Sequence, residues 1–283
     1  MSPSLGLNKA PQQRRGSAPF RSASQGQGTL PRPVDPLEAL AIFVAGIAAG
    51  TINTIVGSGT LITFPVLIAL GYQPLVANVS NNIGLVPGSM TGAYGYRREL
   101  SGQRERVIQL GAFSIAGAVI GATLLLVLPS SAFDAIVPVL IAIALILVVA
   151  QPRLNASSLN RRHREGHRNG AVRGLVSACG VYGGYFGAAQ GILLMGILGL
   201  AIDDTLQRLN GLKNVLAGLN NLTAGLIFVF AASVNWGVAG LIAAGSIIGG
   251  VIGARYGRRL SPTALRVLIV IVGVSAIVRL LVD

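Results

Sequence analysis

The chain has 283 residues, of which 52% are hydrophobic and only 11% are charged, and its mean hydropathy is +0.67. Soluble domains carry about 25% charged residues, so this composition excludes a soluble protein and predicts an integral membrane protein that contacts the lipid bilayer. The net charge of +13 does not indicate nucleic-acid binding, because the arginines form short clusters between apolar segments, as the positive-inside rule predicts.

Residues 1–36 are rich in Gly, Ser, Pro, Gln and Arg. This composition cannot bury a core, so we expect a disordered basic tail. It also lacks the apolar stretch of a secretory signal. We predict a first membrane repeat over 37–150, a basic cytoplasmic linker over 151–172 and a second membrane repeat over 173–283.

Eight hydrophobic segments follow the tail. Six have the length of about 20 residues that one membrane-spanning helix needs, whereas the first and fifth are longer and contain several glycines. We expect these two to be broken helices or helical hairpins in an all-α, polytopic fold. The predicted segments are 37–71, 75–96, 107–128, 132–150, 173–200, 208–232, 236–256 and 263–281.

The linker contains His163 and His167, four residues apart. No third ligand lies nearby in the sequence, so a solvated cationic loop is favoured over a metal site. We expect no metal and no cofactor. Asp203 and Asp204 are expected to be solvated in a second loop.

An internal repeat appears when the chain is shifted by 132 residues. SIAGAVIGA at 114–122 then matches SIIGGVIGA at 246–254 at seven of nine positions. Both segments contain GxxxG pairs, which predict close helix packing. Repeats with polar residues at matched membrane positions are typical of secondary transporters. The same shift pairs Gly59 with Gly191, Asn78 with Asn210, Asn82 with Asn214, and Thr91 with Thr223.

Two topologies fit the loop charges. Either all eight segments cross once with the N-terminus inside, or the first and fifth are hairpins that return to their starting side. Both place equal numbers of basic residues inside. Charges close to a span carry most weight, which favours hairpins and two inverted halves.

Two stretches resemble the TauE/SafE family of sulfite exporters and anion permeases. They are NTIVGSGTLITFPVLIALG followed by ANVSNNIGLVPGS, and GVYGGYFGAAQGILL followed by LNGLKNVLAGLNNLTA. The resemblance covers about 37–283. It implies a multi-pass transporter of the bacterial inner membrane for sulfite, organosulfonates or related small anions. The GSGT turn is shorter than the GxGGG of many members, and Gln190 replaces a small residue, so both bear on which substrate fits.

A small oxyanion needs several N–H or O–H donors and a moderate positive potential. Glycine turns expose backbone N–H groups, and broken helices direct the positive ends of their dipoles at the site. Lys213 is an ionisable residue within a membrane segment, which indicates function, although snorkelling to the interface is the alternative. Asn220, Asn221 and Thr223 are expected to make helix contacts. The predicted substrate-binding residues are Asn53, Gly57, Ser58, Gly59, Thr60, Asn78, Asn81, Asn82, Gly187, Gln190, Gly191, Asn210, Lys213 and Asn214.

The sequence therefore predicts a secondary transporter of a small anion by alternating access. An anion channel using the same site, or a transporter of a non-sulfur carboxylate, is the alternative. An enzyme is disfavoured, because the membrane segments contain no histidine, no paired carboxylates and no GxSxG motif. A coupling proton or sodium ion, and an oligomer, are left open.

Overall fold

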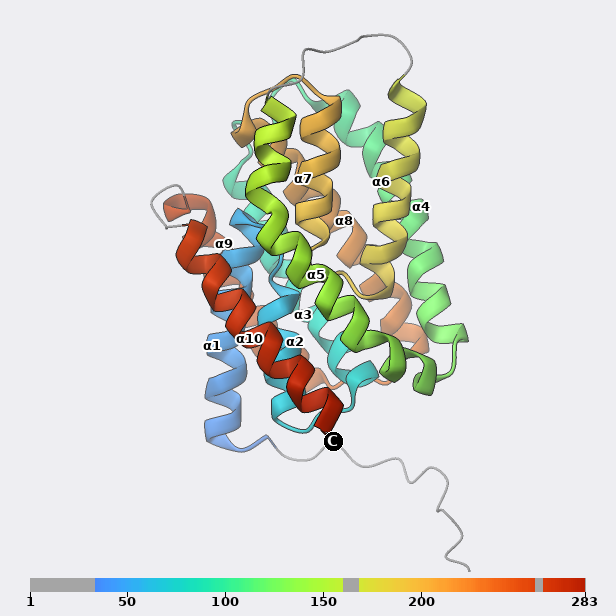
Figure 1. The fold of residues 1–283 in the computed structure, drawn as a ribbon, viewed down its shortest axis with the longest axis vertical. Helices are drawn as coiled ribbons and strands as arrows, with labels where there is room; N and C mark the ends of the chain where they lie inside the picture. Colours follow the sequence, from blue (N-terminus) through green and yellow to red (C-terminus); the bar gives the residue numbers. More distant parts are fainter. Residues whose placement is uncertain (1–33, 160–167, 258–261, 283) are drawn as a thin grey trace, which may run out of the picture. The chain divides into compact units, whose positions relative to one another are not determined.

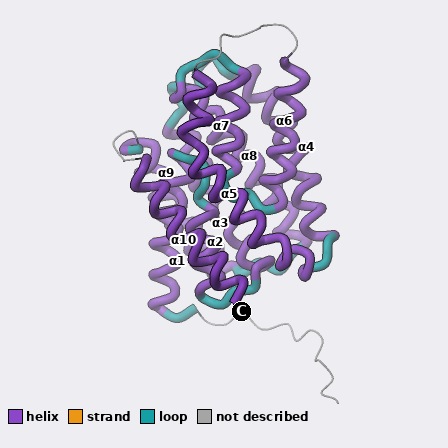
Figure 2. Tube along the Cα trace, in the orientation of Figure 1, coloured by secondary structure: helices purple, strands orange, loops and turns teal. Residues whose placement is uncertain are grey.

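The computed structural model describes residues 34–159, 168–257 and 262–282. Over these ranges the regular structure is entirely α-helical (Figure 2), which confirms the predicted all-α membrane fold. Five of the helices are long and apolar enough to cross a membrane. The tail at 1–33 and the histidines at 163 and 167 lie outside the described residues.

Ten helices make up the described chain (Figure 1). The first and fifth predicted segments are each divided into two helices, as expected. The helix α5 extends nine residues past 150, and α6 begins before 173, so both reach into the predicted linker. The helices are α1 (Pro36–Ile55), α2 (Thr60–Ala69), α3 (Pro74–Gly95), α4 (Arg104–Val127), α5 (Ser130–Leu159), α6 (Arg168–Tyr185), α7 (Gln190–Ala201), α8 (Leu206–Ala231), α9 (Trp236–Tyr256) and α10 (Pro262–Val282).

Glycines bring α9 against α1 at backbone distance. A Cβ added to Gly249 would lie 2.1 Å from the Ile47 carbonyl oxygen, and one on Gly253 would lie 2.8 Å from that of Thr51. Real Cβ atoms do not approach so closely, so only glycine permits this packing. The GxxxG prediction of close helix contact is confirmed here.

The same arrangement joins α4 to α6. A Cβ on Gly117 would lie 2.1 Å from the Ser177 carbonyl oxygen, and one on Gly121 would lie 2.0 Å from that of Val181. Other contacts also occur in corresponding pairs, since α2 packs on α10 and α7 packs on α5. Such correspondence is what two related repeats would produce.

The shift between corresponding residues is not constant along the chain. It is 132 residues for α3 and α8, for α4 and α9, and for α5 and α10, counted from their first residues, but 130 for the helices that begin at Thr60 and Gln190. The shift falls to 130 because α6 has 18 residues and α1 has 20, and it returns to 132 because α7 has 12 residues and α2 has 10. The ungapped pairing of Gly59 with Gly191 is therefore wrong by two residues.

An ionic cluster joins two loops that are distant in sequence. Asp204, before α8, accepts from Arg106 of α4 at 2.9 Å and from Arg208 at 2.8 Å. Its side chain is only 13% exposed, so the expectation that Asp204 is solvated was wrong, whereas Asp203 is exposed. Burial raises the pKa of Asp204, but hydrogen bonds from Arg208, the Thr205 N–H and Arg106 outweigh it and lower the pKa below its ordinary value.

This cluster bears on the two predicted topologies. If every segment crossed once, the loop at 96–103 and the loop at 202–205 would lie on opposite sides of the membrane. They are instead in contact, and Arg208 also donates to the Ser101 carbonyl oxygen at 3.1 Å. The contact supports a fifth segment that returns to its starting side as the α6–α7 hairpin. In Figure 1, α5 runs toward the upper end of the view and α10 runs toward the lower end, so the two helices run in opposite directions.

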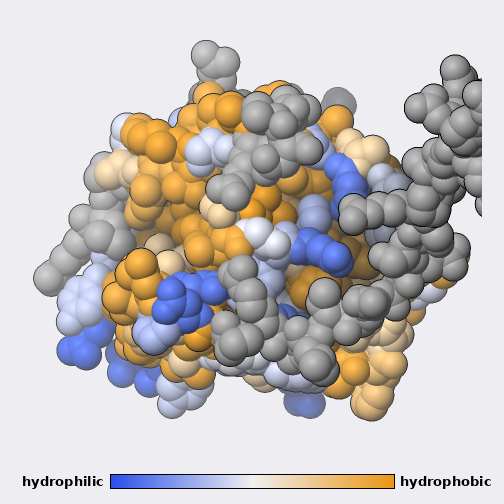
Figure 3. Space-filling view, turned by 90° about the horizontal axis from the view of Figure 1, so that it is seen from below, coloured by the Kyte–Doolittle hydropathy of each residue, from blue (hydrophilic) through white to orange (hydrophobic). Residues whose placement is uncertain are grey.

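The surface of these helices suits a lipid environment. Large apolar side chains are exposed on several of them, including Ile146, Phe230 and Ile271. On the face seen from below in Figure 3, hydrophobic groups predominate and hydrophilic groups lie in separate clusters. The polar residues of the predicted site are buried instead, except Asn53 and Asn210, which are partly buried, so the site lies between helices rather than against lipid.

Candidate anion site at two broken helices

The break between α1 and α2 leaves carbonyl groups without helical partners. The backbone N–H groups of Val56 and Gly57 both donate to the Ile52 carbonyl oxygen, at 2.7 and 3.0 Å. Gly57 then takes a φ of 88°, a left-handed conformation that glycine adopts without steric cost. The carbonyl oxygens of Asn53 and Thr54 therefore need donors from elsewhere in the protein.

The break between α6 and α7 repeats this geometry 130 residues later. Phe186 and Gly187 N–H both donate to the Tyr182 carbonyl oxygen, at 2.9 and 3.1 Å. Gly187 has a φ of 77°, and Ala189 has one of 59°. A left-handed alanine costs energy that surrounding contacts must offset, and such strain is concentrated at functional sites.

The two breaks touch each other through Gly57 and Gly191. The Gly191 N–H donates to the Gly57 carbonyl oxygen at 2.9 Å. A Cβ on either residue would lie 2.3–2.4 Å from the Cα of the other. Both glycines were predicted as site residues, and the structure brings them together at the meeting point of the two broken helices.

Three side chains of α8 converge on the C-terminal end of α1. The Lys213 ammonium donates to the carbonyl oxygens of Asn53 and Thr54, at 3.0 and 3.1 Å. The amides of Asn210 and Asn214 each donate to the Thr54 oxygen at 3.2 Å. Lys213 is fully buried, and no carboxylate of a described residue pairs with it. Its charge therefore faces the negative end of the α1 dipole.

Asn78 of α3 plays the corresponding part at the C-terminal end of α6. Its amide donates to the Tyr185 carbonyl oxygen at 3.0 Å. Asn78 and Asn210 are related by the 132-residue shift, so each binds the broken helix of the opposite half. The oxygen of the Asn78 side chain is buried and has no partner among the described residues.

The N-terminal end of α2 is held by α3. Asn81 donates to the Thr60 hydroxyl at 3.4 Å and accepts from the Thr63 hydroxyl. The hydroxyl of Ser58 is buried without a partner among the described residues, and no described acceptor binds the N–H groups of Ser58 and Gly59. Free donors at a helix N-terminus carry the positive end of the dipole and suit an anion.

Gly59 places this N-terminus beside the end of α1. A Cβ on Gly59 would lie 2.4 Å from the Ala49 carbonyl oxygen and 2.9 Å from Cβ of Asn53. Because residue 59 lies next to residue 49, the chain has reversed direction at the break. Asn53 thus connects the α2 terminus to Lys213, which binds the Asn53 carbonyl oxygen.

The N-terminal end of α7 carries Gln190, whose amide nitrogen is buried without a described partner. A Cβ added to Gly183 would lie 2.3 Å from this amide and 2.6 Å from the Asn220 side-chain oxygen, so only glycine leaves room for the Gln190 side chain. The Tyr182 hydroxyl donates to the Ala188 carbonyl oxygen at 2.6 Å. Gly187 and Gln190 therefore belong to the second break, whereas Lys213 binds the end of α1 at the first.

The predicted residues form one connected region, with one exception. Asn82 points toward α8, where its oxygen would lie 3.5 Å from a Cβ on Gly225, so it does not bind a broken helix as Asn214 does. Sequence reasoning missed Ser89, which accepts from the Asn53 amide at 3.1 Å, and Thr63. Asn220 joins α8 to the carbonyls of Ser114 and Gly180, the helix contact that was predicted.

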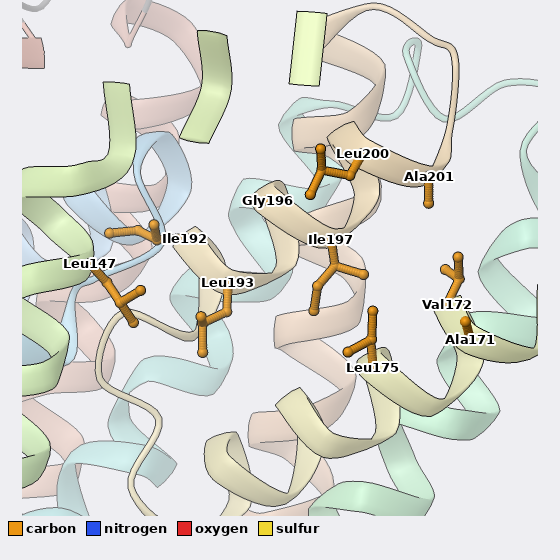
Figure 4. A pocket seen from close by; sticks show the side chains of 10 residues that line it. All are labelled: Leu147, Ala171, Val172, Leu175, Ile192, Leu193, Gly196, Ile197, Leu200 and Ala201. Carbon is orange, nitrogen blue, oxygen red and sulfur yellow. The ribbon is translucent and has the colours of Figure 1, made fainter. Parts of the chain in front are cut away.

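A separate cavity of about 340 Å³ lies between α5, α6 and α7 (Figure 4). Its walls are apolar side chains, among them Leu147, Leu175 and Ile197. An anion would find no donor there, so this cavity is not the predicted site. Among the described residues, no group of three or more His, Cys, Asp or Glu side chains could hold a metal.

Comparison with known proteins now identifies the family. The chain matches the family model "Sulfite exporter TauE/SafE" over residues 42–280. The chain belongs to the TauE/SafE family. It is 31% identical to "Probable membrane transporter protein ORF9" of Sinorhizobium sp over 244 residues, covering 86% of this chain and 92% of that protein.

Two further relatives extend the comparison. The chain is 26% identical to "Probable membrane transporter protein YfcA" of Escherichia coli K12, over 88% of this chain and 92% of that protein. It is 24% identical to a "Probable membrane transporter protein" of Haemophilus influenzae, over 87% and 96%. No solved structure gives a significant match. The predicted family and the membrane-transporter class are confirmed.

Proposed function

We propose that this TauE/SafE protein is a secondary transporter that moves sulfite, an organosulfonate or a related small anion by alternating access. The observation that carries the proposal is the buried ammonium of Lys213, which lies at a broken membrane helix with no carboxylate of a described residue to neutralise it. A net positive charge at this depth favours an anion. The name of the matching family supports sulfur oxyanions as the class.

The anion would bind beside the first break. The free N–H groups of Ser58 and Gly59, the Ser58 hydroxyl and the Asn amides supply neutral donors around the one charge of Lys213. Such a set binds an oxyanion and still allows release, because a cage of several fixed charges would hold it too tightly. The site is closed in this conformation, since Ser58 is 1% exposed and Lys213 is fully buried.

Transport requires this site to open to each side in turn. We assign the movement to the hairpins α1–α2 and α6–α7, which would rearrange against the other six helices. The close Gly57–Gly191 contact is the point at which the two hairpins would slide or separate. The opposite directions of α5 and α10 (Figure 1) support inverted halves, and the basic loops support the inner membrane with those loops in the cytoplasm.

Anion-dependent thermal stabilisation of the purified protein tests the substrate class. Sulfite, sulfate, thiosulfate, taurine, sulfoacetate and acetate are compared with choline as the only added cation and at fixed ionic strength, since a ligand that binds the folded state raises the unfolding temperature. We expect selective stabilisation by one sulfur compound. Lys213→Ala removes the response, whereas Arg98→Ala, which removes one exposed loop cation, retains it. An equal response to all anions, unchanged by Lys213→Ala, contradicts the proposal.

Uptake into proteoliposomes separates a transporter from a channel. A transporter saturates and moves the anion against its gradient when an ion gradient drives it, whereas a channel only dissipates the gradient. Stabilisation by acetate alone would favour the carboxylate alternative. The relatives' names as membrane transporters support a non-enzymatic role.

A further inference from the structure

We propose that Lys213 is a built-in cation of the transporter: its ammonium group occupies the place where a bound sodium ion would bind the carbonyl end of α1. This rests on the proposed function and adds to it the identity of the positive charge. It implies that anion binding at this break requires no sodium ion.

The geometry at the end of α1 is that of a cation site. The Lys213 nitrogen lies 3.0 Å from the Asn53 oxygen and 3.1 Å from the Thr54 oxygen. Unwound carbonyls and C-terminal ends of half-helices are the groups that coordinate sodium in transporters with broken helices. An ammonium group satisfies the same oxygens by hydrogen bonds, and it stays attached to the protein throughout the transport cycle.

No negatively charged side chain among the described residues compensates the buried charge of Lys213. The amides of Asn210 and Asn214 bind the same Thr54 oxygen, and both are neutral. No described carboxylate forms an ion pair with the ammonium. The α1 dipole therefore offsets the lysine charge only in part, because a helix terminus carries about half of an elementary charge.

The other half of the protein lacks this cation. The 132-residue shift places Asn81 opposite Lys213, and Asn81 binds the hydroxyls of Thr60 and Thr63 rather than the end of α6. At that end the backbone carbonyl oxygen of Tyr185 accepts a hydrogen bond from the neutral amide of Asn78. The sequence thus supplies a positive charge at one break only, as expected if one lysine takes over the role of one bound ion.

The test replaces the side chain and supplies the cation from solution. Lys213→Ala removes the ammonium and leaves space, so methylammonium, ethylammonium or sodium can reach the carbonyls, whereas tetramethylammonium has no N–H to donate. Lys213→Met removes the charge but fills the space. The two variants are compared with the wild type in unfolding temperature and in anion uptake, with choline as the inert cation.

We expect methylammonium or sodium to raise the unfolding temperature of Lys213→Ala by at least about 2 °C and its anion uptake by about tenfold. Lys213→Met shows neither gain. Equal responses of the alanine and methionine variants would overturn the proposal. If both variants fail to fold, the wild type decides: uptake and anion stabilisation that are unchanged in choline support it, and a requirement for sodium overturns it.

The two proposals fail separately. The stability gain of Lys213→Ala with methylammonium needs no anion, so it can be observed even if no anion binds the wild type. In that case the built-in cation stands and the transported substrate is wrong. If an anion selectively stabilises the wild type but methylammonium does not stabilise Lys213→Ala, the proposed substrate class stands and the built-in cation is wrong.

Discussion

The backbone N–H of Gly191 donates to the carbonyl oxygen of Gly57 at 2.9 Å, and this bond joins the two broken helices of the protein. Each glycine occupies the space where a side chain of the other would lie. The two breaks are therefore coupled through direct backbone contact, and displacement of one hairpin acts on the other.

Gly191→Ala is expected to destabilise the protein, because its Cβ would lie 2.4 Å from Cα of Gly57. Overpacking of this kind costs about 1–3 kcal/mol. The control is Gly196→Ala on the same helix, where no atom lies within 4 Å of the added Cβ and alanine favours the helix. Thermal unfolding in detergent measures both, and a Gly191→Ala variant as stable as Gly196→Ala would contradict the contact.

The asparagines at the two helix ends are expected to contribute unequally. Asn78 is the one described side chain that donates to the Tyr185 carbonyl oxygen. Asn78→Ala therefore leaves this buried carbonyl without a side-chain donor, at a cost of about 1–3 kcal/mol. Asn210→Ala costs less, because the Thr54 oxygen keeps Lys213 and Asn214 as donors. Denaturant unfolding gives both values. The opposite order would show that Lys213 and Asn214 do not compensate for Asn210.

Cysteine labelling tests the hairpin topology. Arg98→Cys and Asp203→Cys place exposed thiols on two loops that contact each other. Ser131→Cys places one in the first turn of α5. We expect the first two to react from the cytoplasmic side and Ser131→Cys, at the exposed N-terminal end of α5, from the opposite side. The native Cys179 is buried and serves as an unreactive background. Labelling of Asp203→Cys from the same side as Ser131→Cys would favour single crossings.

The stabilising effect of Asp204 should depend on pH. Its pKa is lowered from 3.8 in the folded protein, so its ion pairs contribute fully above that value, and the contribution is lost as the pH falls through the folded pKa. Partly exposed pairs of this kind contribute about 0.2–1 kcal/mol each. Asp204→Asn should therefore lower the unfolding temperature at neutral pH.

The same variant should match the wild type once the pH is well below 3.8. Asp203→Asn is the control, because this neighbouring carboxylate is exposed and has no ion pair among the described residues. A difference between Asp204→Asn and the wild type that persists at low pH would show that the ion pairs are not its cause.

Sequence patterns predicted the local features of the fold. Hydrophobic runs predicted the membrane helices, and glycines within two overlong runs predicted the breaks at 56–59 and 186–189. The repeat was visible, but its register at the breaks was wrong by two residues, because α6 is two residues shorter than α1 and α7 is two residues longer than α2. An ungapped comparison cannot detect a length difference inside one helix.

The sequence alone therefore determined the membrane class and the helices, since hydropathy and backbone freedom are properties of neighbouring residues. It left open whether Lys213 is buried or reaches the membrane interface, and the structure buries it. Only the tertiary structure decided which groups Lys213 binds. The donor and the Asn53 oxygen are 160 residues apart, and either an anion or a helix end could satisfy a buried ammonium. Packing of α8 against the end of α1 brings the carbonyl groups to it, and that placement depends on contacts between helices which no local pattern encodes.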